Sequence, residues 1–256
     1  MKKACSVIPS LLSANFLSLQ NDLNEIDSIG IKKLHYDVMD GHFVNNISFG
    51  EEILKTIVKE NKDKFDIDVH LMVSNPFKKL LDFSKVDYIN KISIHYEVLN
   101  SKHTDDKSLL FSTESNINTK IKCNKSLLKK NIEKLKEIRS IIKQESKKDI
   151  LIGLAINPCT DIKDVVPYIP YFDYFLIMSV VPGKGGQSFI KGSEDKIKFL
   201  DTYRKEHHLD YFIEVDGGIN DVTGKLCLDN GVDYLVCGSF FFKASDKKEL
   251  VKKIIQ

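Results

Sequence analysis

The sequence predicts an α/β protein built as a single (β/α)8 barrel, and three observations support this fold. The chain has 256 residues, close to the roughly 250 that are typical of one such barrel. Short runs rich in β-branched and aromatic residues recur along the chain, and stretches with a helical period separate them. Eight strands can be proposed in this way, which favours a closed barrel over an open doubly wound sheet.

The predicted strands and helices alternate along the chain. We expect strands at residues 4–9, 33–38, 66–71, 88–95, 150–157, 174–180, 211–215 and 233–237. We expect amphipathic helices at residues 17–29, 51–60, 76–83, 126–144, 195–206 and 222–230. Such alternation predicts parallel strands with helices packed outside them.

One connection is longer than the fold requires. The stretch between His95 and Pro158 is about twice as long as the roughly 30 residues that a βαβ unit needs. Residues 99–124 are rich in Lys, Asn, Ser, Thr and Asp and show no period, which is typical of a low-complexity insertion. We therefore expect residues 1–256 to form one catalytic domain that carries an insertion at about 99–124.

Composition excludes several other classes of protein. The 38 basic and 36 acidic residues give a formal charge of +2, so we expect no nucleic-acid partner. No stretch approaches the roughly 18 apolar residues of a membrane span, so we expect no membrane partner. The five cysteines are scattered and include no C-x-x-C pair. These features predict a protein of the reducing cytoplasm.

Four polar residues stand at predicted strand ends, where the active site of a (β/α)8 barrel lies. His35 and Asp37 are two positions apart, so both side chains lie on one face of their strand. His70 and Asp216 stand at the ends of the third and seventh strands. Each residue alone could be a hydrogen-bonded core residue. Together, two imidazoles and two carboxylates in one barrel mouth predict a divalent metal site.

Glycine-containing turns follow the last three predicted strands, at residues 182–187, 217–218 and 238–239. Barrels often bind phosphate with backbone N–H groups of the loops after strands seven and eight. A single glycine pair is more often an ordinary turn, but three such turns around one rim predict a phosphate site.

The methionines are also placed unusually. The three besides Met1 all lie at predicted strand ends: Met39, Met72 and Met178. Methionine usually fills core space. Since Met39 has the parity of Asp37 and Met72 that of His70, we expect these thioethers to line the substrate pocket.

An ordered set of motifs spread over all eight predicted βα units resembles the ribulose-phosphate 3-epimerase family. The motifs are residues 8–14 (IPSLLSA), 35–44 (HYDVMDGHFV), 68–72 (DVHLM), 95–97 (HYE), 157–158 (NP), 178–180 (MSV), 182–183 (PG), 185–187 (GGQ), 215–219 (VDGGI) and 238–239 (GS). The segment at 35–44 is the most specific of them.

The resemblance implies a barrel of the ribulose-phosphate-binding type and a homo-oligomer. It implies an isomerase that interconverts D-ribulose 5-phosphate and D-xylulose 5-phosphate through an enediolate, in the non-oxidative branch of the pentose phosphate pathway. One divalent ion, Zn, Fe, Mn or Co, would be held by His35, Asp37, His70 and Asp216. Asp37 would accept the proton and Asp216 would donate it.

The resemblance also implies residues that hold the phosphorylated ketose. Ser10 and His70 would touch the sugar. The remaining substrate contacts would come from Gly185, Gly186, Gln187, Ser188, Gly217, Gly218, Gly238 and Ser239. Lys184 stands where the family usually has an aromatic residue, a departure that concerns affinity rather than the reaction.

Three alternatives remain open. A 3-epimerase of a six-carbon ketose phosphate, such as allulose 6-phosphate, would use the same metal residues. A decarboxylase or aldolase on a related barrel would normally use a Lys and Asp set on its strands, and the predicted strand ends carry no such lysine. A non-catalytic sugar-phosphate sensor would be expected to have lost one of the four metal residues.

Overall fold

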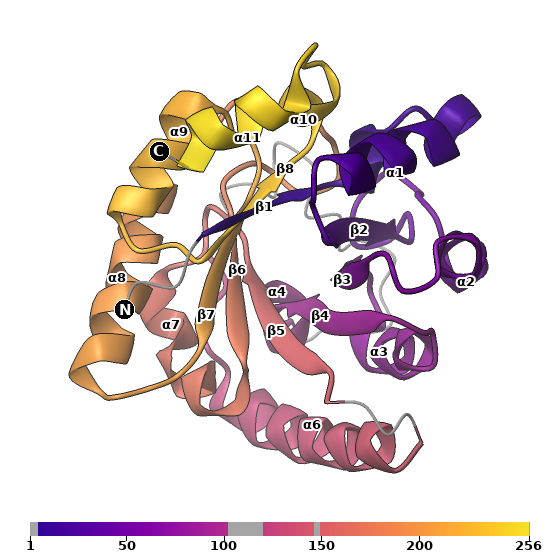
Figure 1. The fold of residues 1–256 in the computed structure, drawn as a ribbon. Helices are drawn as coiled ribbons and strands as arrows, with labels where there is room; N and C mark the ends of the chain where they lie inside the picture. Colours follow the sequence, from indigo (N-terminus) through magenta and orange to yellow (C-terminus); the bar gives the residue numbers. More distant parts are fainter. Residues whose placement is uncertain (1–4, 102–119, 146–148, 256) are drawn as a thin grey trace.

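A barrel of eight parallel strands ringed by helices forms the fold in the computed structural model, which describes residues 5–101, 120–145 and 149–255 (Figure 1). The strands lie in the order β1-β8-β7-β6-β5-β4-β3-β2. Ser10 and His35 form a parallel bridge that joins the two ends of this order. The predicted (β/α)8 barrel is therefore confirmed.

The strands match the predicted runs to within about two residues at either end. They are β1 (Ser6–Pro9), β2 (Lys33–Met39), β3 (Asp66–Met72), β4 (Ile89–His95), β5 (Leu151–Ile156), β6 (Tyr174–Met178), β7 (Phe212–Asp216) and β8 (Tyr234–Cys237).

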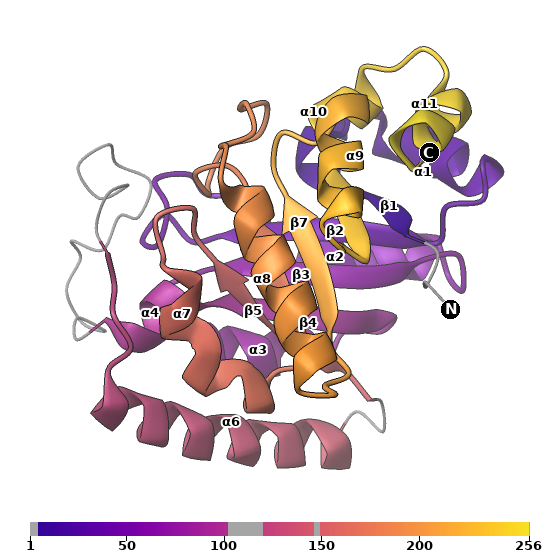
Figure 2. The same ribbon diagram turned by 90° about the vertical axis from the view of Figure 1, so that its left-hand side faces the viewer.

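The outer ring contains the six predicted helices. They are α1 (Leu19–Ser28), α2 (Glu51–Glu60), α3 (Pro76–Ser84), α6 (Lys125–Glu145), α8 (Ser193–Glu206) and α9 (Asp221–Asp229). Figure 2 shows α8 and α9 side by side on the outside of β7. Each helix buries apolar residues, as α2 does with Leu54, Ile57 and Val58.

Several further elements were not predicted. They are α4 (Tyr96–Asn100), α7 (Ile162–Val165), α10 (Ser239–Phe242), α11 (Lys247–Ile255) and the 3-10 turns η1 (Leu11–Ser13), η2 (Phe16–Ser18) and η3 (Val166–Tyr171). Most of them are too short to show a helical period. The C-terminal helix α11 packs against α9 and β1.

Local sequence signals explain where particular helices begin. Asn220 and Thr223 form a capping box at the start of α9, in which each side-chain oxygen accepts a hydrogen bond from the other residue's backbone N–H. Pro76 opens α3, where its missing N–H leaves no hydrogen bond unmade.

The predicted insertion at about 99–124 falls largely on residues 102–119, which lie outside the described residues. At its edges, Leu99 and Asn100 belong to α4 and are buried. Asn124 carries a backbone N–H that donates to Asn100 Oδ1 over 3.0 Å. The one-domain organisation with an insertion stays a prediction.

Two further observations concern the chain as a whole. Among the described residues, every helix is too short or too polar to cross a bilayer. All five cysteines lie in the described part of the chain, and none of them forms a disulfide.

Candidate metal centre and active site

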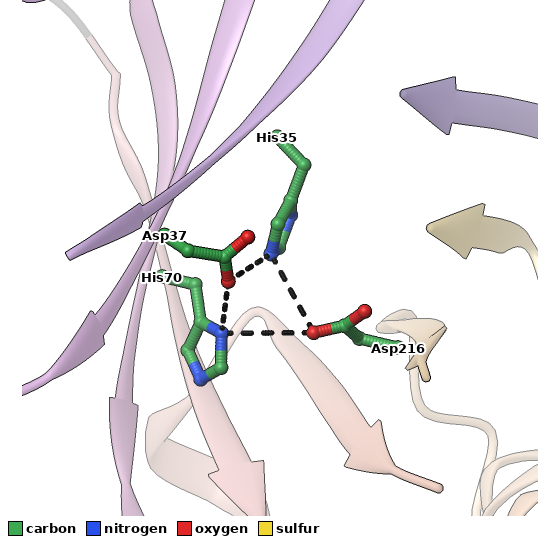
Figure 3. Close-up of side chains that lie close together, drawn as sticks. All are labelled: His35, Asp37, His70 and Asp216. Carbon is green, nitrogen blue, oxygen red and sulfur yellow. Dashed lines mark hydrogen bonds and ion pairs between the residues drawn. The ribbon is translucent and has the colours of Figure 1, made fainter. Parts of the chain in front are cut away.

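The four predicted metal ligands meet at the carboxyl end of the barrel (Figure 3). The register of β2 against β3 places Asp37 directly beside His70. His70 Nδ1 lies 3.0 Å from Asp37 Oδ1 and 3.9 Å from Asp216 Oδ2. His35 Nε2 lies 3.3 Å from Asp37 Oδ1 and 4.0 Å from Asp216 Oδ2. One ligand atom from each residue therefore faces a common point.

This arrangement fits a divalent cation. Ligands about 2.1 Å from a tetrahedral ion stand about 3.4 Å from one another, and the four separations of 3.0 to 4.0 Å bracket that value. Two carboxylates with two neutral imidazoles would balance the charge of such an ion. The buried Nε2 atom of His35 has no hydrogen-bond partner, although it points at this cluster.

A carboxylate beneath the cluster orients His35. Nδ1 of His35 lies 3.1 Å from Asp68 Oδ2. Because a carboxylate can only accept, Nδ1 carries the proton of this contact. Nε2 then faces the cluster, where its lone pair would bind a cation, the arrangement that metal-binding histidines commonly use.

A longer series of hydrogen bonds orients His70. Its Nε2 atom lies 2.8 Å from His95 Nε2, and His95 Nδ1 lies 3.1 Å from Glu97 Oε2. Burial lowers the pKa of His95 to about 4, so this ring is neutral at physiological pH. Glu97 accepts from Nδ1 of His95, so Nε2 of His95 accepts the proton of His70 Nε2. Nδ1 of His70 is left free to bind a cation.

The surroundings act oppositely on the two aspartates. Burial and the charge of Asp37 together raise the pKa of Asp216 to about 7. Burial also opposes ionisation of Asp37, but the two histidines in contact with its Oδ1 atom, His35 above all, outweigh it and hold the pKa of Asp37 far below its usual range. Near neutral pH, one carboxyl group is ionised and the other can hold a proton. Such a split is typical of acid–base pairs.

Ser10 also belongs to this centre. Its hydroxyl group donates a hydrogen bond to Asp37 Oδ2 over 2.6 Å. This bond stabilises the ionised carboxylate and leaves Oδ1 of Asp37 to face the histidines.

A cavity of about 510 Å³ opens above the four residues, a volume within the range of small-molecule sites. The carboxyl groups of Asp37 and Asp216 form part of its floor. The other predicted residues that line it are Ser10, Met39, Met72, Met178, Gly185, Gly186, Gln187, Ser188, Gly217, Gly218, Gly238 and Ser239. The three methionines are buried, and they border the cavity from β2, β3 and β6.

Gly218 shows why the turn after β7 carries no side chain at this position. Gly218 has a φ of +61°, which residues other than glycine rarely adopt. A Cβ atom there would lie 2.4 Å from the backbone nitrogen of Phe189. The turn after β7 therefore presents main chain rather than side chains to the cavity, as a phosphate site requires.

Two predicted substrate residues are placed differently from the rest. His70 is fully buried and is not among the residues that line the cavity. Gln187 uses its side-chain amide to donate to the carbonyl oxygens of Val181 and Lys184, over 2.7 and 2.6 Å. It therefore holds the shape of the loop after β6. Substrate contacts from His70 and Gln187 stay predictions.

Several other residues of the site were not predicted from the sequence. Lys243 lines the cavity together with Lys184. Asp68 and Glu214 lie below the four ligands, two positions before His70 and Asp216, so strand parity could have found them. Lys91 was missed because it stands inside β4 rather than at its end.

Comparison with known proteins agrees with this geometry. The profile of the Ribulose-phosphate 3 epimerase family matches residues 6–109 and 108–242. Among curated proteins, the chain is 32% identical to ribulose-phosphate 3-epimerase of Chlamydia muridarum, covering 99% of this chain and 95% of that protein. It is 30% identical to the Bacillus subtilis enzyme of the same name, with 97% of each chain covered. The enzyme of Synechocystis is 34% identical, with 98% and 93% covered.

Solved structures share the fold at low identity. The 3-hexulose-6-phosphate synthase of Salmonella typhimurium has a TM-score of 0.59 at 11% identity, covering 98% of this chain and 96% of that one. KGPDC from Streptococcus mutans has a TM-score of 0.60 at 10% identity, covering 98% and 95%. The sequence relatives go further than the fold, because they match nearly the whole chain at about 30% identity. The chain belongs to the ribulose-phosphate 3-epimerase family, a family of isomerases.

Proposed function

We propose that the protein inverts carbon 3 of a phosphorylated ketopentose and so interconverts D-ribulose 5-phosphate and D-xylulose 5-phosphate. The observation that carries this proposal is the opposite effect of the surroundings on two carboxyl groups at one cavity floor. The pKa of Asp37 is held low, whereas that of Asp216 is raised to about 7. Inversion next to a ketone requires one base and one acid.

The two aspartates divide the proton transfers. In one direction, ionised Asp37 removes the C3 proton and leaves an enediolate, and protonated Asp216 returns a proton to the opposite face. The roles exchange in the reverse direction. Ser10 donates a hydrogen bond to Oδ2 of Asp37, which helps to keep this carboxyl group ionised and able to accept a proton. A divalent ion held by His35, Asp37, His70 and Asp216 would act as a Lewis acid that stabilises the negative charge on the substrate oxygens.

The rest of the cavity would bind the substrate. Glycine turns after β6, β7 and β8 would hold the phosphate through backbone N–H groups, with the hydroxyl of Ser239 beside them. Met39, Met72 and Met178 would form an apolar wall along the carbon chain. Binding energy at the phosphate orients the distant C3 atom.

The test compares turnover of ribulose 5-phosphate and allulose 6-phosphate on one purified sample, with metal analysis of that sample. We expect kcat/KM to favour ribulose 5-phosphate and one equivalent of Zn, Fe, Mn or Co per chain. A preference for allulose 6-phosphate would reassign the substrate to a six-carbon ketose. Binding of either sugar phosphate without turnover would indicate a sensor and contradict the proposal.

The wider role follows from this chemistry. We place the reaction in the non-oxidative branch of the pentose phosphate pathway, in the cytoplasm, within one catalytic domain. We also propose a homo-oligomer, because Leu17 is fully exposed and lies next to Phe16, whose ring packs 4.9 Å from that of Phe49. Exposed Ile47 and Ile53 flank Phe49 in the sequence. Light scattering that returns the mass of one chain would contradict this part.

A further inference from the structure

A lysine is buried in the barrel below the proposed metal centre, and the reaction does not use it. Lys91, on β4, is 4% exposed. Its Nζ atom lies 3.1 Å from Asp68 Oδ2 and is hydrogen-bonded to Glu214 Oε2. The rings of Tyr174 and Tyr234 lie with their centres 4.9 and 4.4 Å away. Two carboxylates and two aromatic faces therefore surround the ammonium group.

The barrel is shaped to hold this group. Tyr174 reaches the interior because residue 153 is glycine: a Cβ atom there would lie 2.3 Å from the Tyr174 ring. The Tyr174 hydroxyl donates to Asp68 Oδ1 over 3.2 Å and so fixes that carboxylate. Burial disfavours the charged lysine, but Asp68 and Glu214 outweigh it and raise the pKa of Lys91 above its ordinary value. The two carboxylates therefore pair with a charged lysine.

The carboxylates that hold Lys91 also belong to a second candidate cation position. His35, Asp68 and Glu214 each offer a ligand atom, and these atoms lie within 4.8 Å of one another. Nδ1 of His35 lies 3.1 Å from Asp68 Oδ2 and 3.6 Å from Glu214 Oε1. We call these three residues the lower position. The upper position comprises His35, Asp37, His70 and Asp216. The two positions share His35, whose ring nitrogens face opposite sides.

We propose that Lys91 is a built-in cation that fills the lower position and thereby confines the protein to one divalent ion, at the upper position. This inference rests on the proposed metal centre. Its physical basis is charge: Asp68 and Glu214 would attract a cation of their own if left unpaired in a buried site. The ammonium of Lys91 satisfies them without supplying a second Lewis acid.

The charges also set the design of the variants. Asp68 and Glu214 each pair with the ammonium group of Lys91, so they count as two negative charges. With Lys91 the lower position carries one net negative charge. Lys91→Met leaves two negative charges there, and adding Glu214→Gln returns the net charge to one while removing a ligand.

The experiment is equilibrium dialysis against Mn²⁺ at pH 8, followed by metal analysis. We expect one ion per chain for the wild-type protein, two for Lys91→Met, and one for Lys91→Met/Glu214→Gln. Anomalous diffraction from Mn²⁺-soaked crystals of Lys91→Met should show the second ion between the carboxylates of Asp68 and Glu214, on the Nδ1 side of His35. A matched control is Lys196→Met, because Lys196 is also buried but donates to the carbonyl oxygens of Asn157 and Pro158. It should bind one ion.

One ion in folded Lys91→Met, or a second ion located elsewhere, would overturn the inference. A wild-type protein that binds no ion would instead contradict the proposed metal centre itself.

The double variant provides a test if Lys91→Met does not fold. It has the wild-type net charge in the lower position and keeps Asp68 as the acceptor of His35 Nδ1. Its affinity for Mn²⁺ should therefore escape the roughly 10- to 100-fold loss that follows disruption of groups behind metal ligands. A loss of that size would mean that Lys91 is needed for the upper position, and it would overturn the inference.

Discussion

Nε2 of His70 lies 2.8 Å from Nε2 of His95, so the two imidazoles share one proton between these atoms. His95 in turn bonds through Nδ1 to Glu97, which also accepts from the backbone N–H of Asn157 and the hydroxyl of Thr160. The side chains of His70, His95, Glu97 and Thr160 are all buried. The carboxylate of Glu97 therefore sets the orientation of His70, a proposed metal ligand, through His95, which lies between them.

Glu97→Gln tests this series of hydrogen bonds. The amide can turn its NH₂ group toward His95, which removes the acceptor that fixes the tautomers of both histidines. We expect the affinity for Mn²⁺ to fall roughly 10- to 100-fold, measured by calorimetric titration. Thr160→Val is the matched control, because it removes one hydrogen bond to Glu97 but keeps the carboxylate. Equal effects of the two variants would mean that packing, not the tautomer, matters.

The barrel was predictable because its signal is repeated. Each strand is a short apolar run and each helix an amphipathic stretch, so an error at one boundary leaves the alternation intact. Helix α4 escaped prediction because its five residues are all buried, which leaves no polar face to reveal a period.

The upper position was predictable for a different reason. His35, Asp37, His70 and Asp216 all stand near strand ends, where the fold gathers functional residues. Lys91 could not be found in that way. Its partners Asp68 and Glu214 lie on other strands, and a sequence does not show which charges in a barrel interior pair with one another.

Metal binding should release protons in a pH-dependent way. Without metal, Asp216 has a pKa of about 7 because of burial and the charge of Asp37. It therefore holds a proton at pH 6 that an arriving cation must displace, and it has lost that proton by pH 8. The pKa of His35 lies well above its ordinary value, because Asp37, Asp68 and Glu214 outweigh its burial, so His35 releases a proton at both values.

Calorimetry in buffers of different ionisation enthalpy measures this release. The number of protons released per ion should fall by up to about one between pH 6 and pH 8 in the wild-type protein. In Asp216→Asn the fall should be much smaller. The same fall in both proteins would assign the proton to another group.

The two lysines at the cavity should attract the dianionic substrate. Lys184 and Lys243 are exposed and line the cavity. Lys184→Met or Lys243→Met should raise KM by up to about fivefold, as for an exposed ion pair of about 1 kcal/mol, and leave kcat nearly unchanged. Initial rates at low and high salt should show the effect shrinking as screening increases. Lys191→Met, an exposed lysine that does not line the cavity, is the control. If neither variant changes KM at low salt, the two lysines do not contribute to substrate binding.

The last prediction separates the two aspartates, because each is proposed to serve one face of C3. Asp216→Asn removes the acid that completes inversion of ribulose 5-phosphate, so epimerisation should fall by roughly 10²- to 10⁴-fold. Asp37 is retained and can still take the C3 proton, exchange it with solvent and return it to the same face. In D₂O, NMR should therefore show deuterium entering C3 of ribulose 5-phosphate faster than xylulose 5-phosphate forms. Asp37→Asn should abolish that exchange.

With xylulose 5-phosphate as the starting sugar, the pattern should reverse: Asp37→Asn should exchange the C3 proton and Asp216→Asn should not. Both aspartates are proposed metal ligands, so metal content is measured on each sample and only metal-loaded protein is compared. The reversal is the decisive feature, because a loss of metal or of stability would slow exchange from both sugars alike. Near wild-type epimerisation by Asp216→Asn, or exchange that depends on the variant but not on the starting epimer, would contradict the assignment of one acid to each face.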